Sequence, residues 1–179
     1  GDLVRERSEK HLNYLLNTIS YIIIKKGNKM KLKVFKMRED AKLPVRAHPT
    51  DAGMDLFYCP KDDEKNRSVF PGHTGLFGTG LKISVPANHM LEIKNKSGIA
   101  SKRQLVVGAC VIDNGYDGEI LVNLHNIGTW PQSVEAGEKI AQAVLIPIVT
   151  PEIEEINEDS IYGGDTARGA GGFGSTGNM

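Results

Sequence analysis

From Met30 onward, apolar and polar residues alternate with a period of two over short stretches, and this alternation restricts the fold more than any other feature of the chain. It occurs in residues 31–34 (KLKV), 81–85 (LKISV) and 119–124 (EILVNL). Successive side chains of a β-strand point to opposite faces of a sheet, so the period predicts strands with one buried face. Two denser apolar runs, residues 105–107 (LVV) and 143–146 (AVLI), are typical of strands buried on both faces.

Clusters of Gly, Pro, Asn and Asp separate these stretches. They lie at residues 60–63, 71–72, 86–88, 113–115, 128–131 and 136–137. Such residues favour tight turns, and no long amphipathic helix is evident after Met30. Many short strands at roughly regular spacing predict an all-β sandwich, jelly roll or barrel.

Composition bounds the size and the class of the protein. The 179 residues, 40% of them apolar, fit one globular domain with one core. The 22 Lys and Arg balance the 22 Asp and Glu, which argues against a general nucleic-acid or anionic-membrane binder. Cys59 and Cys110 are too few for a disulfide scaffold or a four-thiolate zinc site. No apolar run approaches the ~20 residues that span a bilayer, so we expect a soluble, cytoplasmic protein.

Residues 1–29 differ from the rest of the chain. They mix charged residues with leucines and isoleucines at roughly helical spacing, and they fit neither a secretory signal nor a transit peptide. Met30 resembles a natural start. We interpret residues 1–29 as a non-native extension, introduced by cloning or by upstream translation. The alternative is a genuine amphipathic helix that docks on a partner.

The C-terminal residues 163–179 form a third kind of segment. Seven of these seventeen residues are glycine, and Phe173 and the final Met179 are the only large apolar residues among the last fifteen. A segment of this composition is expected to be flexible on its own. Residues 169–174 match GxGxxG, but no strand precedes them and no helix follows, so dinucleotide-binding and P-loop interpretations are rejected. One arginine, one ring, two hydroxyls and many accessible amides predict an arm that grips a phosphorylated ring compound.

Three further segments carry residues suited to chemistry in strand-connecting turns. Residues 51–56 (DAGMDL) hold two carboxylates around a glycine, and residues 95–102 (NKSGIASK) resemble an anion-binding turn. Residues 111–118 (VIDNGYDG) predict a β-hairpin with a tyrosine at its tip. Each signal is weak alone, because an Asp in a tight turn most often bonds its own backbone.

The order of these segments resembles the trimeric, all-β dUTP diphosphatases. Five motifs of that family have counterparts here, at residues 51–56, 96–100, 108–118 and 137–142 and in the tail from Arg168. The resemblance covers residues 31–177. It implies a distorted jelly roll or β-barrel over residues 30–162, a flexible glycine-rich arm over residues 163–179, and a homotrimer in which three subunits build each site.

The resemblance also implies a reaction. Water would attack the α-phosphorus of dUTP, giving dUMP and diphosphate, with Mg²⁺ chelated by the triphosphate. Such an enzyme limits uracil incorporation into DNA and supplies dUMP for thymidylate synthesis. An aspartate is ionised at neutral pH and can deprotonate the water, and Asp113 is the match for this base. Tyr116 would exclude a 2′-hydroxyl, while the backbone around Cys110, Val111, Ile112 and Leu121 would bind the uracil edge.

The remaining matches concern the triphosphate. Lys96, Ser97 and Gly98 would hold the α- and β-phosphates, and Asp55 and Gln142 would act indirectly, through metal-bound water or by bracing loops. In the arm, Arg168 would reach the γ-phosphate and Phe173 would stack on uracil. Gly174, Ser175 and Thr176 would complete the phosphate cradle. We expect no nucleic acid or membrane as a partner, and, for a viral source, a location in the host-cell cytoplasm or nucleus.

Two departures from the family pattern affect these expectations. Asn95-Lys96 replaces the usual proline-arginine, which loses the bidentate guanidinium and predicts weaker phosphate binding. Cys110 stands where a glycine is usual, so either the following segment is shifted or the thiol fills a buried gap.

Two other functions remain open at this point. A dCTP deaminase of similar fold needs a glutamate proton shuttle at the position that Asn123 occupies, and an amide cannot serve that role. A dUTP-responsive regulatory protein could use residues 1–29 or the charged residues 61–67 (KDDEKNR) to bind a partner, although such a run is usually a solvated loop.

Overall fold

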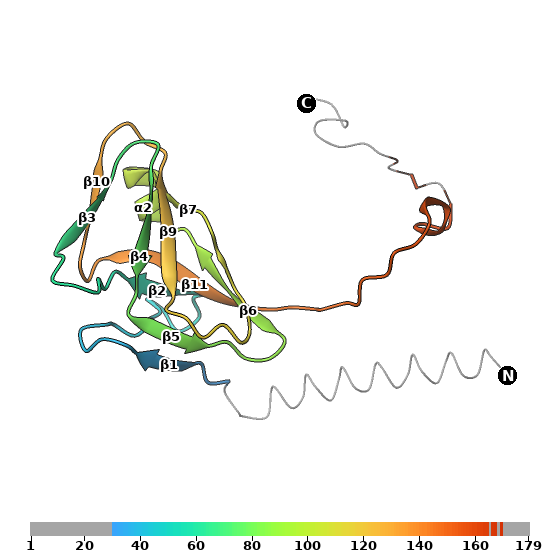
Figure 1. The fold of residues 1–179 in the computed structure, drawn as a ribbon, viewed down its shortest axis with the longest axis horizontal. Helices are drawn as coiled ribbons and strands as arrows, with labels where there is room; N and C mark the ends of the chain where they lie inside the picture. The colour runs from blue at the N-terminus through green and yellow to red at the C-terminus, as the bar shows by residue number, and fades with distance from the viewer. Residues whose placement is uncertain (1–29, 165, 168, 170–179) are drawn as a thin grey trace. The chain divides into compact units, whose positions relative to one another are not determined.

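The computed structural model describes residues 30–164, 166, 167 and 169. In that part of the chain, strands dominate and one short α-helix occurs, which confirms the all-β prediction (Figure 1). The elements are β1 (Lys33–Lys36), β2 (Gly53–Phe57), β3 (Asn66–Val69), β4 (Thr74–Gly78), β5 (Leu81–Ser84), β6 (His89–Lys94), α2 (Ser97–Arg103), β7 (Leu105–Val107), β8 (Val111–Ile112), β9 (Leu121–Asn126), β10 (Gln132–Glu135), β11 (Lys139–Pro147) and the 3₁₀ turn η1 (Glu158–Ser160).

The strands form several small antiparallel sheets. One has the order β2-β11-β6-β8, a second has the order β4-β9-β7, and β1-β5 and β3-β10 are two-stranded. Figure 1 shows the β3-β10 ribbon and the β1-β5 ribbon as separate extensions at the margins of the body. This arrangement of short sheets around one core fits the predicted distorted jelly roll.

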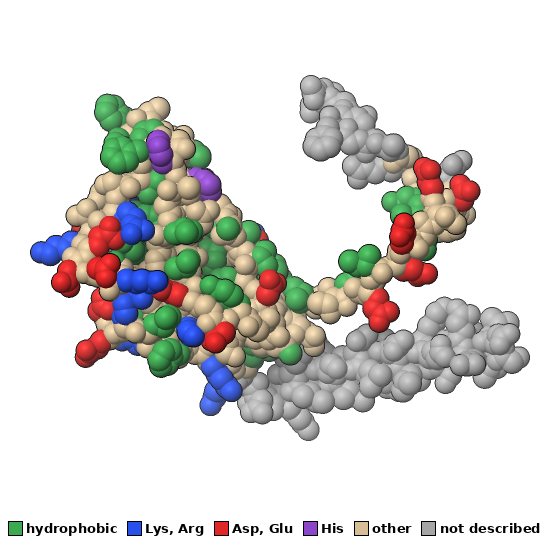
Figure 2. Space-filling view, in the orientation of Figure 1, with side chains coloured by type: hydrophobic (Ala, Val, Ile, Leu, Met, Phe, Trp, Pro, Cys, Tyr) green, Lys and Arg blue, Asp and Glu red, His purple; other side chains and the backbone are tan. Residues whose placement is uncertain are grey.

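The core is built from the alternating apolar positions. In β9, Val122 and Leu124 are buried whereas Leu121 and His125 are exposed, as the period of two predicts. Phe77 is fully buried, and the Tyr58 ring meets it edge to face at 5.0 Å between centroids. On the surface, Figure 2 shows positive and negative side chains interspersed over the lower part of the body, in keeping with the balanced composition.

The predicted hairpin at residues 111–118 is wrong. β8 pairs with β6, and β9 pairs with β4 and β7, so the two strands belong to different sheets. The chain does turn at Asp113, where the N–H of Tyr116 donates to the Asp113 carbonyl at 3.3 Å and Gly115 has φ +88°. It then runs on until the Ile120 N–H donates to the Leu81 carbonyl at 2.8 Å, which carries it to the second sheet.

Three local expectations also differ from the structure. The anion-binding turn expected at residues 95–102 is instead mostly the helix α2, which ends at Gln104 in the left-handed region. The expected double burial of residues 143–146 holds for Ala143 only, because the next three side chains are half-buried. β1 and β9 each begin two residues later than the alternation suggested, at Lys33 and Leu121.

The described residues fall into two compact units. The first ends at Ile148 and the second begins at Val149, where Val149 and Ile153 are strongly exposed. This boundary precedes residue 163, where the arm was expected to start, and the division into residues 1–29, 30–162 and 163–179 stays a prediction. Residues 1–29 lie outside the described part. No described helix is long and apolar enough to cross a membrane.

Candidate active site

A pocket of about 260 Å³ lies where β8 and the following loop face β4 and β9. It brings together six of the residues that the sequence singled out: Cys110, Val111, Ile112, Asp113, Tyr116 and Leu121. Leu76, Ile93, Ala109, Glu119 and Asn123 complete its lining. A mostly apolar pocket with a few polar groups is the usual form of a small-molecule site.

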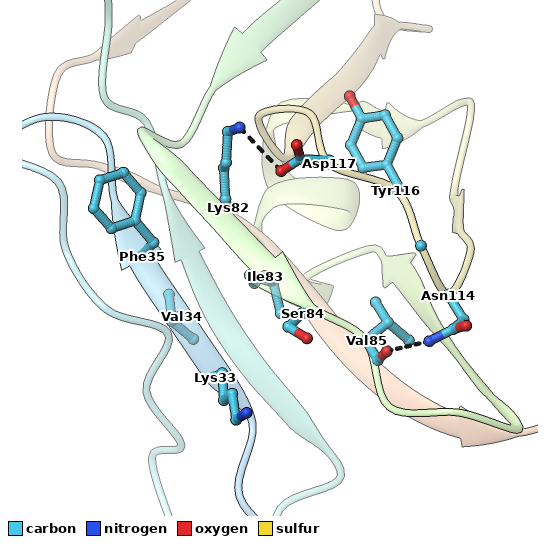
Figure 3. Close-up of a pocket in the computed structure, with 11 residues that line it drawn as sticks. Lys33, Val34, Phe35, Lys82, Ile83, Ser84, Val85, Asn114, Tyr116 and Asp117 are labelled. Carbon is cyan, nitrogen blue, oxygen red and sulfur yellow. Dashed lines mark hydrogen bonds and ion pairs between the residues drawn. The ribbon is translucent and has the colours of Figure 1, made fainter.

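The turn at residues 113–116 presents Asp113 at the surface of this pocket. Gly115 supplies the positive φ that the turn requires. The Asn114 side chain anchors the loop, because its Nδ2 donates to the Val85 carbonyl at 2.6 Å (Figure 3). Asp113 is therefore an exposed carboxylate on a fixed turn.

The Tyr116 ring is held by its own loop. Its hydroxyl donates to the Glu119 carbonyl at 3.1 Å, and the ring lies so close to Gly118 that an added Cβ there would be 2.1 Å from the hydroxyl oxygen. Tyr116 is nonetheless 48% exposed, so part of the residue is accessible to a ligand. The ring can lie this close to the backbone only because residue 118 is a glycine.

Strand β8 offers backbone groups to the pocket. Among the residues that the structure describes, it lies at the end of its four-stranded sheet and pairs only with β6, with Ile112 opposite Leu91 and Val111 opposite Glu92. The outer edge of an end strand has N–H and C=O groups available for a ligand. Cys110 is partly buried and packs against the core, which agrees with the gap-filling interpretation of its thiol.

Asn123 forms one wall of the pocket, and its amide is engaged on both sides. Its Nδ2 donates to Thr74 Oγ1 at 2.6 Å, and its Oδ1 accepts from the Ala109 N–H at 3.1 Å. The side chain thus braces the residues before β8 against β4.

A second group of residues forms around Asp55, on β2. Its carboxylate is almost buried, with 8% of the side chain exposed, and it lies 2.6 Å from Lys96 Nζ and 2.9 Å from Lys139 Nζ. Burial opposes ionisation of Asp55, but hydrogen bonds from both lysines outweigh this effect and lower the pKa of its carboxyl. Gln142 lies opposite Asp55 in the sheet, and its Nε2 donates to the Asn95 carbonyl at 2.8 Å.

Lys96 leads directly into α2, whose first residues are Ser97 and Gly98. Both are exposed, and α2 has no buried residue. The other end of α2 is tied down by Arg103, which contacts Glu138 and donates to the Ser133 carbonyl at 2.5 Å. Ser97 and Gly98 therefore lie beside the Asp55 group on an anchored segment.

Comparison with known proteins shows the family to which the chain belongs. The model of the dUTPase family matches residues 39–177. The deoxyuridine 5′-triphosphate nucleotidohydrolase of Clostridium tetani (strain Massachusetts / E88) is 44% identical over 148 residues, covering 82% of this chain and 96% of that protein. The enzyme of the same name from Gloeothece citriformis (strain PCC 7424) is 41% identical over 150 residues, covering 83% and 97%. The chain belongs to the dUTPase family.

Solved dUTPases share the fold. The Staphylococcus bacteriophage 80alpha dUTPase, solved with dUPNHPP, superimposes with a TM-score of 0.74 at 28% identity, covering 84% of this chain and all of that one. A mutant dUTPase from phage phi11 of S. aureus has a TM-score of 0.65 at 26% identity, covering 72% and 98%. That structure is described as showing the coordination of a structural Mg(II) ion.

The dUTPase site residues named from the sequence fall into two groups within the chain. The pocket lining includes neither Asp55, Lys96, Ser97 nor Gln142. The predicted residues of the arm, Arg168, Phe173, Gly174, Ser175 and Thr176, lie outside the described residues. The sequence reasoning missed Lys139, because a bulge between Lys139 and Ala141 turns this side chain toward Asp55, and a bulge has no signal in the alternation.

A larger pocket, of about 540 Å³, lies on the other side of the Asp113–Tyr116 turn, between the turn and β1-β5 (Figure 3). Lys82 Nζ and Asp117 Oδ1 are 3.0 Å apart at its margin, but 90% of the Asp117 side chain is exposed. An exposed pair of this kind contributes little to stability.

Proposed function

We propose that this dUTPase-family chain hydrolyses dUTP to dUMP and diphosphate. The observation that carries the proposal is the pocket in which Asp113, Tyr116 and the free edge of β8 lie together. The relatives from Clostridium tetani and Gloeothece citriformis are named deoxyuridine 5′-triphosphate nucleotidohydrolases, and this name supports the same substrate.

The reaction assigned to Asp113 is general-base catalysis. Water attacks the α-phosphorus, its oxygen forms the new P–O bond, and the bond from the α-phosphorus to the bridging oxygen of the diphosphate breaks. The Asp113 carboxylate accepts the proton of the water, and diphosphate leaves with the bond's electron pair. An exposed carboxylate on a fixed turn suits this role, because substrate and water can reach it while the turn holds its position.

Selection of the nucleoside falls to β8 and Tyr116. The unpaired backbone edge of β8 provides donors and acceptors for the uracil edge, and a cytosine amino group would oppose a donor there. The accessible part of Tyr116 packs against the deoxyribose, which leaves no room for a 2′-hydroxyl.

The triphosphate is assigned to the group around Asp55. Lys96 supplies positive charge, while Ser97 and the amides near Gly98 supply donors. Arg168, Phe173, Gly174, Ser175 and Thr176 of the arm are assigned to the γ-phosphate, the base and the phosphate cradle, as the motif order implies.

Mg²⁺ is proposed as part of the substrate. Within the described residues, no three His, Cys, Asp or Glu side chains come together as a metal site, and both oxygens of Asp55 are bound by lysines. This donor set fits a metal held by the substrate's phosphates and by water, with Asp55 and Gln142 acting indirectly. When bound, the ion would neutralise charge on the triphosphate.

We further propose a homotrimer with shared sites. Within one chain the nucleoside pocket and the phosphate-binding group are separate sets of residues, so one site assembled from two chains, with the arm of a third, would join them. The cytoplasmic location stays a proposal as well.

Deamination of dCTP is disfavoured by the contacts of Asn123. This side chain stands where the deaminase needs a glutamate, and its amide already serves Thr74 and Ala109. Enzyme-dependent ammonia release from dCTP would contradict the diphosphatase proposal. For the regulatory alternative, capture of one partner by the protein only when dUTP is present would be the supporting result.

The test of the main proposal is diphosphate release with Mg²⁺ from dUTP, dCTP, dTTP and UTP. We expect strong selectivity for dUTP, lost in Asp113→Asn. Asp117→Asn is the matched control, because Asp117 lies in the same loop but its exposed side chain faces Lys82. The proposal fails if the folded wild-type trimer releases no diphosphate from dUTP, or if both variants are equally active.

A further inference from the structure

Glu119 is a nearly buried carboxylate in the lining of the nucleoside pocket, and the proposed reaction does not use it. Only 7% of its side chain is exposed. Its Oε1 contacts Arg38 Nη2 and accepts the Gly80 N–H at 2.9 Å, and its Oε2 lies 3.4 Å from Arg38 Nη1. Arg38 is itself 17% exposed.

The surrounding backbone is shaped to admit this ion pair. A Cβ added at Gly78 would be 2.5 Å from Glu119 Oε1. One added at Gly80, where φ is +70°, would be 2.7 Å from the Ala41 Cβ and 3.2 Å from Arg38 Nη2. Gly78, the last residue of β4, and Gly80, in the turn that follows, therefore make room for the pair.

Arg38 connects Glu119 to the rest of the scaffold. Its Nη2 also donates to the Cys59 carbonyl at 2.6 Å, just after β2, and the Cys59 N–H donates to the Gly78 carbonyl at 2.7 Å. The Glu119 side chain is thus fixed to the end of β2 and to the β4–β5 turn.

The backbone of the same residue holds Tyr116. The Tyr116 hydroxyl donates to the Glu119 carbonyl at 3.1 Å, and the ring is half-exposed, so packing alone does not fix its position. A shift of the Glu119 backbone would move the acceptor on which the ring depends.

We propose that Glu119, held by Arg38 and Gly80, is a positioning residue that fixes the Tyr116 ring and thereby sets the discrimination between deoxyribonucleotides and ribonucleotides. The inference rests on the proposed function, because it assigns Tyr116 to the sugar. Glu119 does not contact the substrate; it acts through Tyr116.

The electrostatics of the pair agree with a permanently charged brace. Burial opposes ionisation of Glu119, but the Arg38 and Gly80 hydrogen bonds outweigh it and lower the pKa of the carboxyl. The bond to Glu119 raises the pKa of Arg38. Lys61 Nζ, 4.0 Å from Glu119 Oε2 and mostly exposed, adds a weaker attraction.

The test compares Glu119→Gln with the wild type through the ratio of kcat/KM for dUTP to kcat/KM for UTP. A glutamine has the same shape but only one acceptor oxygen, so its NH₂ group faces either Arg38 or the Gly80 N–H. We expect the ratio to fall about tenfold, with a smaller fall in Arg38→Lys, which keeps the charge. Binding of dUMP and UMP, measured by calorimetry, should show the same loss of discrimination.

The control is Arg103→Met, which removes an ion pair with Glu138 and a bond to Ser133 without touching the Tyr116 loop. It should lower the melting temperature and leave the dUTP-to-UTP ratio unchanged. The inference is overturned if Glu119→Gln keeps the wild-type ratio in both assays, or if Arg103→Met lowers it equally. Absence of dUTP hydrolysis in the wild type would instead contradict the proposed function, and the calorimetric ratio would still decide the role of Glu119.

Discussion

Asp55 and Lys96 form an ion pair, 2.6 Å between Oδ1 and Nζ, that joins β2 to the residue preceding α2. Lys139 binds the other carboxylate oxygen at 2.9 Å. The first, second and fourth sequence motifs therefore meet at one carboxylate. This arrangement gives Asp55 a task that does not require it to touch a metal: it holds two ammonium groups side by side.

Asp55→Asn should destabilise the fold, because an amide cannot compensate two ammonium groups. We expect a loss of about 1–3 kcal/mol in the free energy of unfolding at pH 7, measured by urea denaturation. The pKa of Asp55 lies below its ordinary value of 3.8, so the stabilisation is present above pH 3.8 and is lost as the pH falls through the lower, folded-state pKa. The wild type should lose more stability than the variant on acidification. Asp117→Asn removes one partner of an exposed ion pair, so it should change neither the free energy of unfolding at pH 7 nor its loss on acidification.

Lys96→Arg should strengthen substrate binding. A guanidinium can bind phosphate with two parallel hydrogen bonds, whereas the Lys96 ammonium is a point charge shared with Asp55. We expect KM for dUTP to fall several-fold, because the guanidinium can make one more charge-assisted hydrogen bond to phosphate, and kcat should change little. Lys96→Met should raise KM. A KM that rises in both variants would show that the ammonium is required for its fit beside Asp55.

Tyr58→Phe should remove one partly buried hydrogen bond and little packing. The Tyr58 hydroxyl donates to Glu64 Oε2 at 2.7 Å, and its ring keeps the edge-to-face contact with Phe77 without the hydroxyl. We expect a loss of about 1 kcal/mol. Burial first, and then the bond to Glu64, raises the pKa of Tyr58 to about 12.

The raised pKa of Tyr58 also predicts a pH dependence. Its contribution to stability is fully present below pH 10, the ordinary tyrosine value, and is lost as the pH rises toward 12. Denaturation at pH 9 and pH 11 should show a larger drop for the wild type than for Tyr58→Phe. An equal drop in both would assign the alkaline instability to other groups.

Local pattern determined what the sequence could predict. The alternation in β9 placed Val122 and Leu124 in the core, and the Asp-Asn-Gly turn was found because Gly115 adopts the conformation that its residue type favours. The motif order grouped the residues from Cys110 to Tyr116, Asp113 among them, and most of these line one pocket. These features depend on neighbours within a few residues.

Long-range contacts account for the features that the sequence could not predict. Arg38 and Glu119 are 81 residues apart, and neither belongs to a pattern that suggests a partner. The hairpin prediction failed because turn chemistry specifies the turn and not the sheet that the next strand joins. β8 pairs with β6 and β9 pairs with β4. Packing of the whole core decides these pairings, and the residues that determine the packing are spread over the chain.

Gly118→Ala should weaken sugar discrimination by moving Tyr116 directly. The new Cβ would lie 2.1 Å from the Tyr116 hydroxyl oxygen and 2.3 Å from Cζ, so the ring must shift and its bond to the Glu119 carbonyl must lengthen or break. We expect the kcat/KM ratio of dUTP to UTP to fall about tenfold or more. Gly72→Ala is the control, because it strains a positive φ of +74° but meets no atom within 4 Å. If both variants lower stability and only Gly118→Ala lowers the ratio, the position of the Tyr116 ring, and not general destabilisation, controls the choice of sugar.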